Sequence, residues 1–164
     1  MSEELYNKKI NTFTHIHLHT TYSMLDGVGK SAAYAARCKE LGMEACCITD
    51  HGTMAGLFEF YTEMTKVGVK PILGNEMYCV EDMHRRGLTD AEKDGLTPTE
   101  IREKNKMRLR SPHLLLLAEN DIGLRNLFRL NYYANTEGYY GKPRIDLDLL
   151  EKYSEGIIAT TTCV

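Results

Sequence analysis

The sequence has no long hydrophobic run and no strong charge of one sign. No apolar stretch in the 164 residues approaches the length that crosses a membrane. Residues 1–11 are polar and lack the apolar centre of a signal peptide. The formal net charge is −3, so no strongly basic field draws the whole chain to nucleic acid. We therefore expect a soluble, cytoplasmic protein with no membrane partner.

Paired cysteine motifs, internal repeats and low-complexity tracts are also missing. The five cysteines are an odd number, none forms a Cys-x-x-Cys pair, and Cys46 and Cys47 are adjacent in an apolar run. This usage favours reduced thiols that mostly fill the core over a disulfide scaffold. The composition is 43% hydrophobic and 26% charged, which is ordinary for one globular domain with a real core. We expect a single domain over residues 1–164.

Segments that are typical of strands alternate with segments that are typical of helices. Apolar runs predict strands over residues 12–18, 45–49, 69–80, 113–118 and 156–161. Helical patterns cover residues 30–41, 53–64 (capped by Thr53), the stretch that begins at Asp121, and residues 146–153. This order predicts an α/β fold with mostly parallel strands, either an open doubly wound sheet or an incomplete barrel.

Residues 81–110 differ from the rest because they are charged and contain few large apolar side chains. Thr97-Pro98-Thr99-Glu100 resembles a capping box with proline at the first helical position. We therefore expect an excursion with one short exposed helix. A charge-rich stretch of this kind is more often a solvated surface than a binding patch.

Histidines and acidic residues gather where the predicted strands end. His17 and His19 lie two residues apart in the first strand, so both imidazoles can point to one face. Ligands bind at the carboxyl edge of α/β sheets, and a mixed set of imidazoles and carboxylates suits Zn²⁺, Mn²⁺ or Fe²⁺. More than four such ligands indicate more than one ion. The further candidates after the first, second and third strands are Asp26, Asp50, His51 and Glu76.

Each candidate also has a purely structural interpretation. His17 and His19 could be packed histidines of a strand, and Asp26 could be the turn residue before Gly27. Glu76 falls in a strand that otherwise reads as buried, where an unpaired carboxylate is costly. The clustering of these residue types favours metal binding over the separate structural interpretations.

Five segments carry a more specific signal. They are HLHTTYSMLDG at 17–27, ITDHG at 48–52, KPILGNE at 70–76, HLLLLA at 113–118 and KPRID at 142–146. In these segments the chain resembles the PHP (polymerase and histidinol phosphatase) family, and the sequence of the segments is similar to the N-terminal domain of bacterial DNA polymerase III alpha subunits. The resemblance runs from about residue 13 to the end, apart from the charged insert at about 81–110.

The resemblance implies a distorted β/α barrel with two or three divalent metal ions at one mouth. By matching motif, it implies Asp50 as a partner that orients a histidine and Ser23 as a residue that packs near the first motif. His113 begins its strand, so only the resemblance places it at the mouth, and Cys163 could equally be a small core residue. The family's last motif, Asp-x-His, has no counterpart before Val164, so we expect a partial barrel. The implied metal ligands are His17, His19, Asp26, His51, Glu76, His113 and Cys163.

The resemblance also implies a function in DNA replication. The first hypothesis is metal-dependent phosphodiester hydrolysis of the 3′–5′ exonuclease type, with DNA, the rest of a polymerase chain and other replisome subunits as partners. The second is a silent scaffold that stabilises the polymerase or binds a proofreading partner, and the third is a free histidinol-phosphatase-like enzyme. An aromatic and basic loop could contact single-stranded nucleic acid or simply pack on the barrel rim. Its residues are Tyr139, Tyr140, Lys142 and Arg144.

Overall fold

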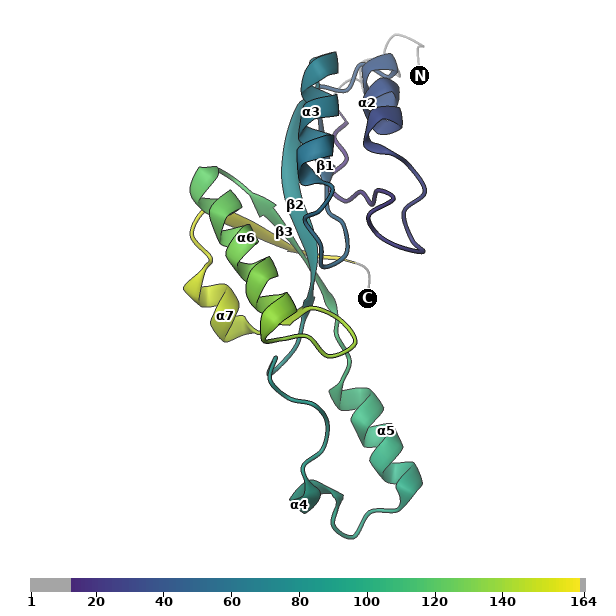
Figure 1. Cartoon of the computed structure of the whole chain (residues 1–164), viewed down its shortest axis with the longest axis vertical. Coiled ribbons are helices and arrows are strands. Elements are labelled where there is room, and N and C mark those ends of the chain that lie inside the picture. Colours follow the sequence, from purple (N-terminus) through teal and green to yellow (C-terminus); the bar gives the residue numbers. More distant parts are fainter. Residues whose placement is uncertain (1–12, 163–164) are drawn as a thin grey trace, which may run out of the picture.

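The computed structural model describes residues 13–162, which form an elongated α/β structure with a protruding arm (Figure 1). The strands are β1 (Ala45–Ile48), β2 (Lys70–Cys79), β3 (His113–Ala118), β4 (Arg144–Ile145) and β5 (Ile157–Thr161). The helices are α2 (Ser31–Glu40), α3 (Leu57–Val67), α4 (Asp90–Lys93), α5 (Pro98–Arg108), α6 (Asp121–Thr136) and α7 (Leu147–Lys152). The predicted α/β class is confirmed. Within the described part of the chain, no helix has the length and apolar character needed to cross a membrane.

The strands form one mixed sheet in the order β1-β2-β3-β5, with β4 beside the end of β2. The expected parallel pairing holds for β1 with β2 and for β4 with β2. By contrast, β3 runs antiparallel to β2, and β5 runs antiparallel to β3.

The reversed direction of β3 follows from the connection before it. A parallel neighbour needs a crossover that packs back on the sheet, but the chain between β2 and β3 leaves the sheet as the arm that carries α4 and α5 (Figure 1). The chain therefore returns beside β2 in the opposite direction. As a result His113, the first residue of β3, pairs with Tyr78 near the end of β2.

The two faces of the sheet differ because side chains alternate along each strand. One face packs under α2, α3 and α6, where Phe60, Met77, Leu116 and Leu127 are all fully buried. Burial of each such side chain contributes roughly 1.5–3 kcal/mol. The other face carries a smaller apolar cluster of Cys47, Leu115 and Leu117. Glu76 pairs with Leu115, so its carboxylate belongs to this second face.

The predicted role of cysteine is confirmed for the described part of the chain. Cys38, Cys46 and Cys47 are buried free thiols, and Cys79 is a half-buried free thiol. Cys163 lies outside the described residues.

Three local predictions were wrong. Within residues 13–18 only His15 forms a bridge, to Cys46, because Leu18 N–H donates to the Thr49 side chain and not to a backbone carbonyl. Helix α3 begins after Gly56, since the Thr53 hydroxyl instead accepts from the nearby Ala55 N–H. The arm contains two helices, and both begin with a capping box; the box at Thr97 and Glu100 was predicted, whereas that at Thr89 and Glu92 was not.

Candidate metal centre

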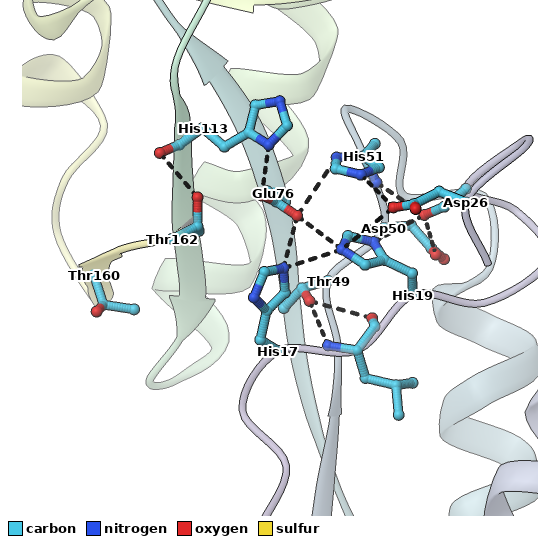
Figure 2. A network of polar contacts seen from close by, with 12 residues as sticks. His17, His19, Asp26, Thr49, Asp50, His51, Glu76, His113, Thr160 and Thr162 are labelled. Atoms are coloured by element: carbon cyan, nitrogen blue, oxygen red, sulfur yellow. Dashed lines mark hydrogen bonds and ion pairs between the residues drawn. The ribbon is translucent and has the colours of Figure 1, made fainter. Parts of the chain in front are cut away.

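The buried carboxylate of Glu76 is surrounded by four histidines (Figure 2). Its Oε2 lies 2.8 Å from His17 Nε2 and 2.9 Å from His19 Nε2. The same oxygen lies 3.4 Å from His51 Nδ1. The other oxygen, Oε1, lies 2.8 Å from His113 Nδ1. Residues from four separate segments of the chain therefore meet at one carboxylate.

Asp26 closes the exposed side of this cluster. Its Oδ2 lies 2.7 Å from His51 Nε2 and 3.9 Å from His19 Nε2. The Asp26 side chain is 56% exposed, whereas that of Glu76 is 0% exposed. The cluster thus has one carboxylate in the interior and one at the solvent boundary.

The sheet explains why these residues meet. The segment with His17 and His19 runs beside β1, since Cys47 N–H donates to His15 O and Thr49 N–H donates to Leu18 O. His51 follows β1 and forms a bridge with Glu76 of β2. Because β3 is antiparallel, its first residue, His113, reaches the same end of the sheet.

Asp50 orients the cluster through a hydroxyl group. Its Oδ1 accepts from the Ser23 hydroxyl at 2.6 Å and from Thr20 N–H at 2.7 Å, and its Oδ2 accepts from the Thr20 hydroxyl at 2.7 Å. Because the Ser23 proton goes to Asp50, the Ser23 oxygen accepts from His19 Nδ1, 3.1 Å away. In the protonated imidazole both ring nitrogens donate, Nδ1 to Ser23 and Nε2 to Glu76. Loss of the Nε2 proton leaves a lone pair directed at the same place, as a metal ligand requires.

The electrostatics of the cluster favour an ionised glutamate. Burial alone would raise the pKa of Glu76, but the hydrogen bonds with His19 and His17 outweigh burial and lower the pKa to about 2. The hydrogen bond to Glu76 raises the pKa of His19, whereas burial lowers the pKa of His51. The carboxylate is therefore negative at neutral pH and available to a cation.

Two features fit a bound cation better than a closed hydrogen-bond network. His17 Nε2 and His19 Nε2 lie 3.0 Å apart, and both nitrogens also face the same Glu76 oxygen. Two N–H donors to that oxygen would repel each other, whereas two lone pairs and a carboxylate suit a shared divalent ion. In addition, the buried His51 Nδ1 has no hydrogen-bond partner among residues 13–162.

The potential ligand atoms fall into three overlapping groups, each with its atoms within 4.8 Å of one another. Glu76, His19 and His51 each belong to two groups, which suits neighbouring ions that share ligands. The groups are His17/His19/Glu76, His19/Asp26/His51 and His51/Glu76/His113.

The structure thus brings together six of the seven implied ligands, and the seventh, Cys163, lies outside the described residues. Sequence reasoning missed Tyr78 and Thr20. Tyr78 packs edge-on against His113 and parallel to His51, and the alternation from Glu76 to position 78 was the signal that could have found it. Thr20 gives both its N–H and its hydroxyl to Asp50.

The loop proposed for nucleic acid divides into exposed and buried members. Tyr139 and Tyr140 are exposed, and so is Lys142. Arg144 is 2% exposed and donates to the carbonyls of Gly138, Met83 and Arg85. Of the two interpretations of this loop, the structure favours packing for Arg144, because its guanidinium donates inside the fold.

The fold and site together define an α/β domain with a histidine–carboxylate centre at one end of its sheet. The family model for the PHP domain matches residues 15–164, so the chain belongs to the PHP domain family.

The curated relatives are much longer proteins. The DNA polymerase III subunit alpha of Helicobacter pylori (strain 26695) is 43% identical over 157 residues, which cover 96% of this chain and 12% of that one. The subunit of the same name from Aquifex aeolicus is 40% identical over 152 residues, which cover 93% of this chain and 12% of that one. The chain therefore spans about 12% of the length of these relatives.

The chain is also similar to a solved structure. It is a Bifidobacterium adolescentis protein described as a candidate metal-dependent phosphoesterase, with 21% identity and a TM-score of 0.44. The match covers 73% of this chain and 33% of that one.

Proposed function

We propose that this PHP domain hydrolyses phosphodiester bonds with the help of divalent metal ions, as a 3′–5′ exonuclease acting on a DNA primer end. The observation that carries the proposal is the buried Glu76 carboxylate in contact with four histidines. The similarity to DNA polymerase III alpha subunits supports DNA and the rest of a polymerase chain as partners.

The residues that would hold the ions are those of the three groups described above. Such ions, two or three of Zn²⁺, Mn²⁺ or Fe²⁺, supply an activated water and neutralise the charge that develops on the phosphoryl oxygens. Glu76 would bind the ions from the interior, and Asp26 would bind them from the exposed side. We also infer Cys163 as a ligand.

The protein's own residues set the geometry of this reaction. Asp50 and Ser23 hold the His19 ring with Nε2 directed at the centre. Glu76 is shielded from solvent, which strengthens its interaction with a cation. The exposed Asp26 side marks where a phosphodiester can approach. No nucleophilic side chain is required by this arrangement.

The test combines metal content with nuclease activity. We expect the chain to bind Mn²⁺ or Zn²⁺ and, within its complete polymerase chain, to shorten a 5′-labelled primer from its 3′ end. His17→Ala/His19→Ala should lose both properties, because each residue contacts Glu76. His15→Ala/His84→Ala is the matched control, since neither histidine belongs to the metal-binding groups.

The alternatives give different results. Metal binding without cleavage of any phosphoester would contradict the proposal and favour the scaffold. Cleavage of phosphomonoesters alone would favour a small-molecule phosphatase. If His15→Ala/His84→Ala also lost activity, the loss in His17→Ala/His19→Ala would not be specific to the metal-binding groups, and the assignment of His17 and His19 would fail.

A further inference from the structure

The loop between α6 and β4 is fixed at its base. Arg144 Nε donates to Gly138 O at 2.9 Å, and its Nη2 donates to Met83 O and Arg85 O at 2.9 Å and 3.0 Å. Tyr140 N–H donates to Lys142 O at 3.0 Å. The position of Lys142 is therefore set by the fold.

This loop lies against the metal centre. A Cβ added to Gly52, the residue after His51, would fall 2.4 Å from Pro143 Cγ, so Pro143 packs directly on the His51-Gly52 turn. Asn131 of α6 also donates to Gly52 O at 2.9 Å. The contacts bring the loop to the turn that supplies a candidate ligand.

The Lys142 ammonium sits over an aromatic ring that packs on the cluster. Its Nζ lies 4.5 Å from the centroid of Tyr78. That ring is stacked with His51 at a centroid distance of 6.0 Å and meets His113 edge-on at 4.9 Å. A ring face attracts a cation, so Tyr78 holds a positive charge beside the histidines.

Lys142 has no carboxylate partner among the described residues, and it is exposed. It therefore retains free N–H donors beside a site that we propose to act on phosphoesters. An ammonium cannot ligate a metal ion, but it is a good donor to phosphate oxygens.

We propose that Lys142 is a substrate-binding residue that donates to a non-bridging phosphate oxygen of the ester held at the metal centre. The proposal rests on the phosphoesterase function proposed above. It assigns Lys142 to the substrate and not to the metal, so metal content and phosphate affinity should separate.

The test measures inorganic phosphate binding to the Mn²⁺-loaded full chain by calorimetry, with metal content measured in parallel. Lys142→Met keeps the aliphatic stem over Tyr78 and removes the charge. We expect it to bind Mn²⁺ as the unaltered protein does and to bind phosphate about tenfold more weakly, the effect of losing one charge-assisted hydrogen bond. Lys142→Arg should restore most of the affinity.

Lys152→Met is the matched control, because Lys152 Nζ also lies over a tyrosine ring, 5.3 Å from the centroid of Tyr153, but that ring stacks on Tyr133 and not on a candidate ligand. It should leave phosphate affinity unchanged. Equal phosphate affinity in Lys142→Met and Lys152→Met, in chains that bind Mn²⁺, overturns the role of Lys142 alone. An unaltered chain that takes up no metal overturns the proposed function, and the role of Lys142 with it.

Discussion

The cluster around Glu76 and the arm at 81–110 are both rich in polar side chains, but they are built in opposite ways. In the cluster a buried carboxylate meets partly exposed partners that are far away in sequence, as with His17 and Glu76 or His113 and Glu76. In the arm the contacts are exposed and mostly local, as in the capping box of Thr97 with Glu100.

The difference shows what each arrangement depends on. A capping box forms wherever a few residues adopt helical geometry. The cluster exists only when three strands align in the correct register. Substitutions in the cluster should therefore affect metal binding strongly, whereas substitutions in the arm should have local effects.

The largest effect is expected for Glu76→Gln. The amide keeps the size of the side chain but removes the charge and one acceptor oxygen from two of the three ligand groups. Loss of an outer partner already costs about 10–100-fold in metal affinity, so loss of this central carboxylate should cost more than about 100-fold. Calorimetric titration with Mn²⁺ measures it. Glu119→Gln, an exposed acid beyond β3, is the control, and equal affinities in the two variants would rule out Glu76 as a ligand.

Ser23→Ala tests the positioning of His19 and should have the next largest effect. The change removes the link from Asp50 to His19 and leaves a buried carboxylate with one donor fewer. We expect a metal affinity lower by about 10–100-fold and a free energy of unfolding lower by about 1–3 kcal/mol.

Ser31→Ala is a closely matched control for Ser23→Ala. Both serines are 1% exposed, but the Ser31 hydroxyl finds no hydrogen-bond partner in the part of the chain that the structure describes. Its removal should therefore be neutral or stabilising, with metal affinity unchanged. If the two variants behaved alike, the network through Ser23 would have no special role.

The same contrast explains which features the sequence predicts. Helix α5 and its cap depend on neighbouring residues, so Thr97-Pro98-Thr99-Glu100 was sufficient to place its start. The convergence of His17 and His19 was also predictable, although the strand expected to carry them is absent between residues 13 and 18 apart from one bridge at His15.

His113 shows where local pattern ends. A residue at the beginning of a strand lies at the wrong end of a parallel sheet, and only the antiparallel direction of β3 brings it to Glu76. The direction depends on the path of the arm, which a strand pattern does not encode. Likewise, the residue type and the charge of Arg144 suit nucleic-acid binding. In the structure, however, three backbone carbonyls from two other segments hold its guanidinium inside the fold.

A smaller effect is expected in the loop that carries Asp26. Leu25 has φ of 68° and a fully exposed side chain, so it adopts the left-handed region without packing in return. The left-handed conformation costs leucine roughly 1–2 kcal/mol, a strain that glycine would relieve. Glycine also has greater chain entropy in the unfolded state, which takes back about 0.5–1 kcal/mol of that gain. Leu25→Gly should therefore raise the free energy of unfolding, measured in urea, by up to about 1.5 kcal/mol.

Met24→Gly provides the comparison for Leu25→Gly. Met24 is 85% exposed but does not have a positive φ. Glycine there should lower stability slightly, because it adds only chain entropy to the unfolded state. A loss of stability in both variants would show that the Leu25 side chain makes contacts that outweigh the strain.

The smallest and most local effect is expected at the start of α5. Thr97→Ala removes the cap, which costs about 1 kcal/mol of helix stability, and amide exchange should quicken in α5 while metal affinity stays unchanged.

Hydrogen bonds from Thr97 lower the pKa of Glu100. Because the folded pKa lies below the unfolded one, this stabilisation is present above the unfolded pKa and is lost as the pH falls. Exchange in α5 should thus quicken on acidification in the unaltered protein and less so in Thr97→Ala. The control is Thr99→Ala, at the second residue of α5, which should keep the pH dependence of exchange. A change in metal affinity in Thr97→Ala would contradict the separation of the arm from the cluster.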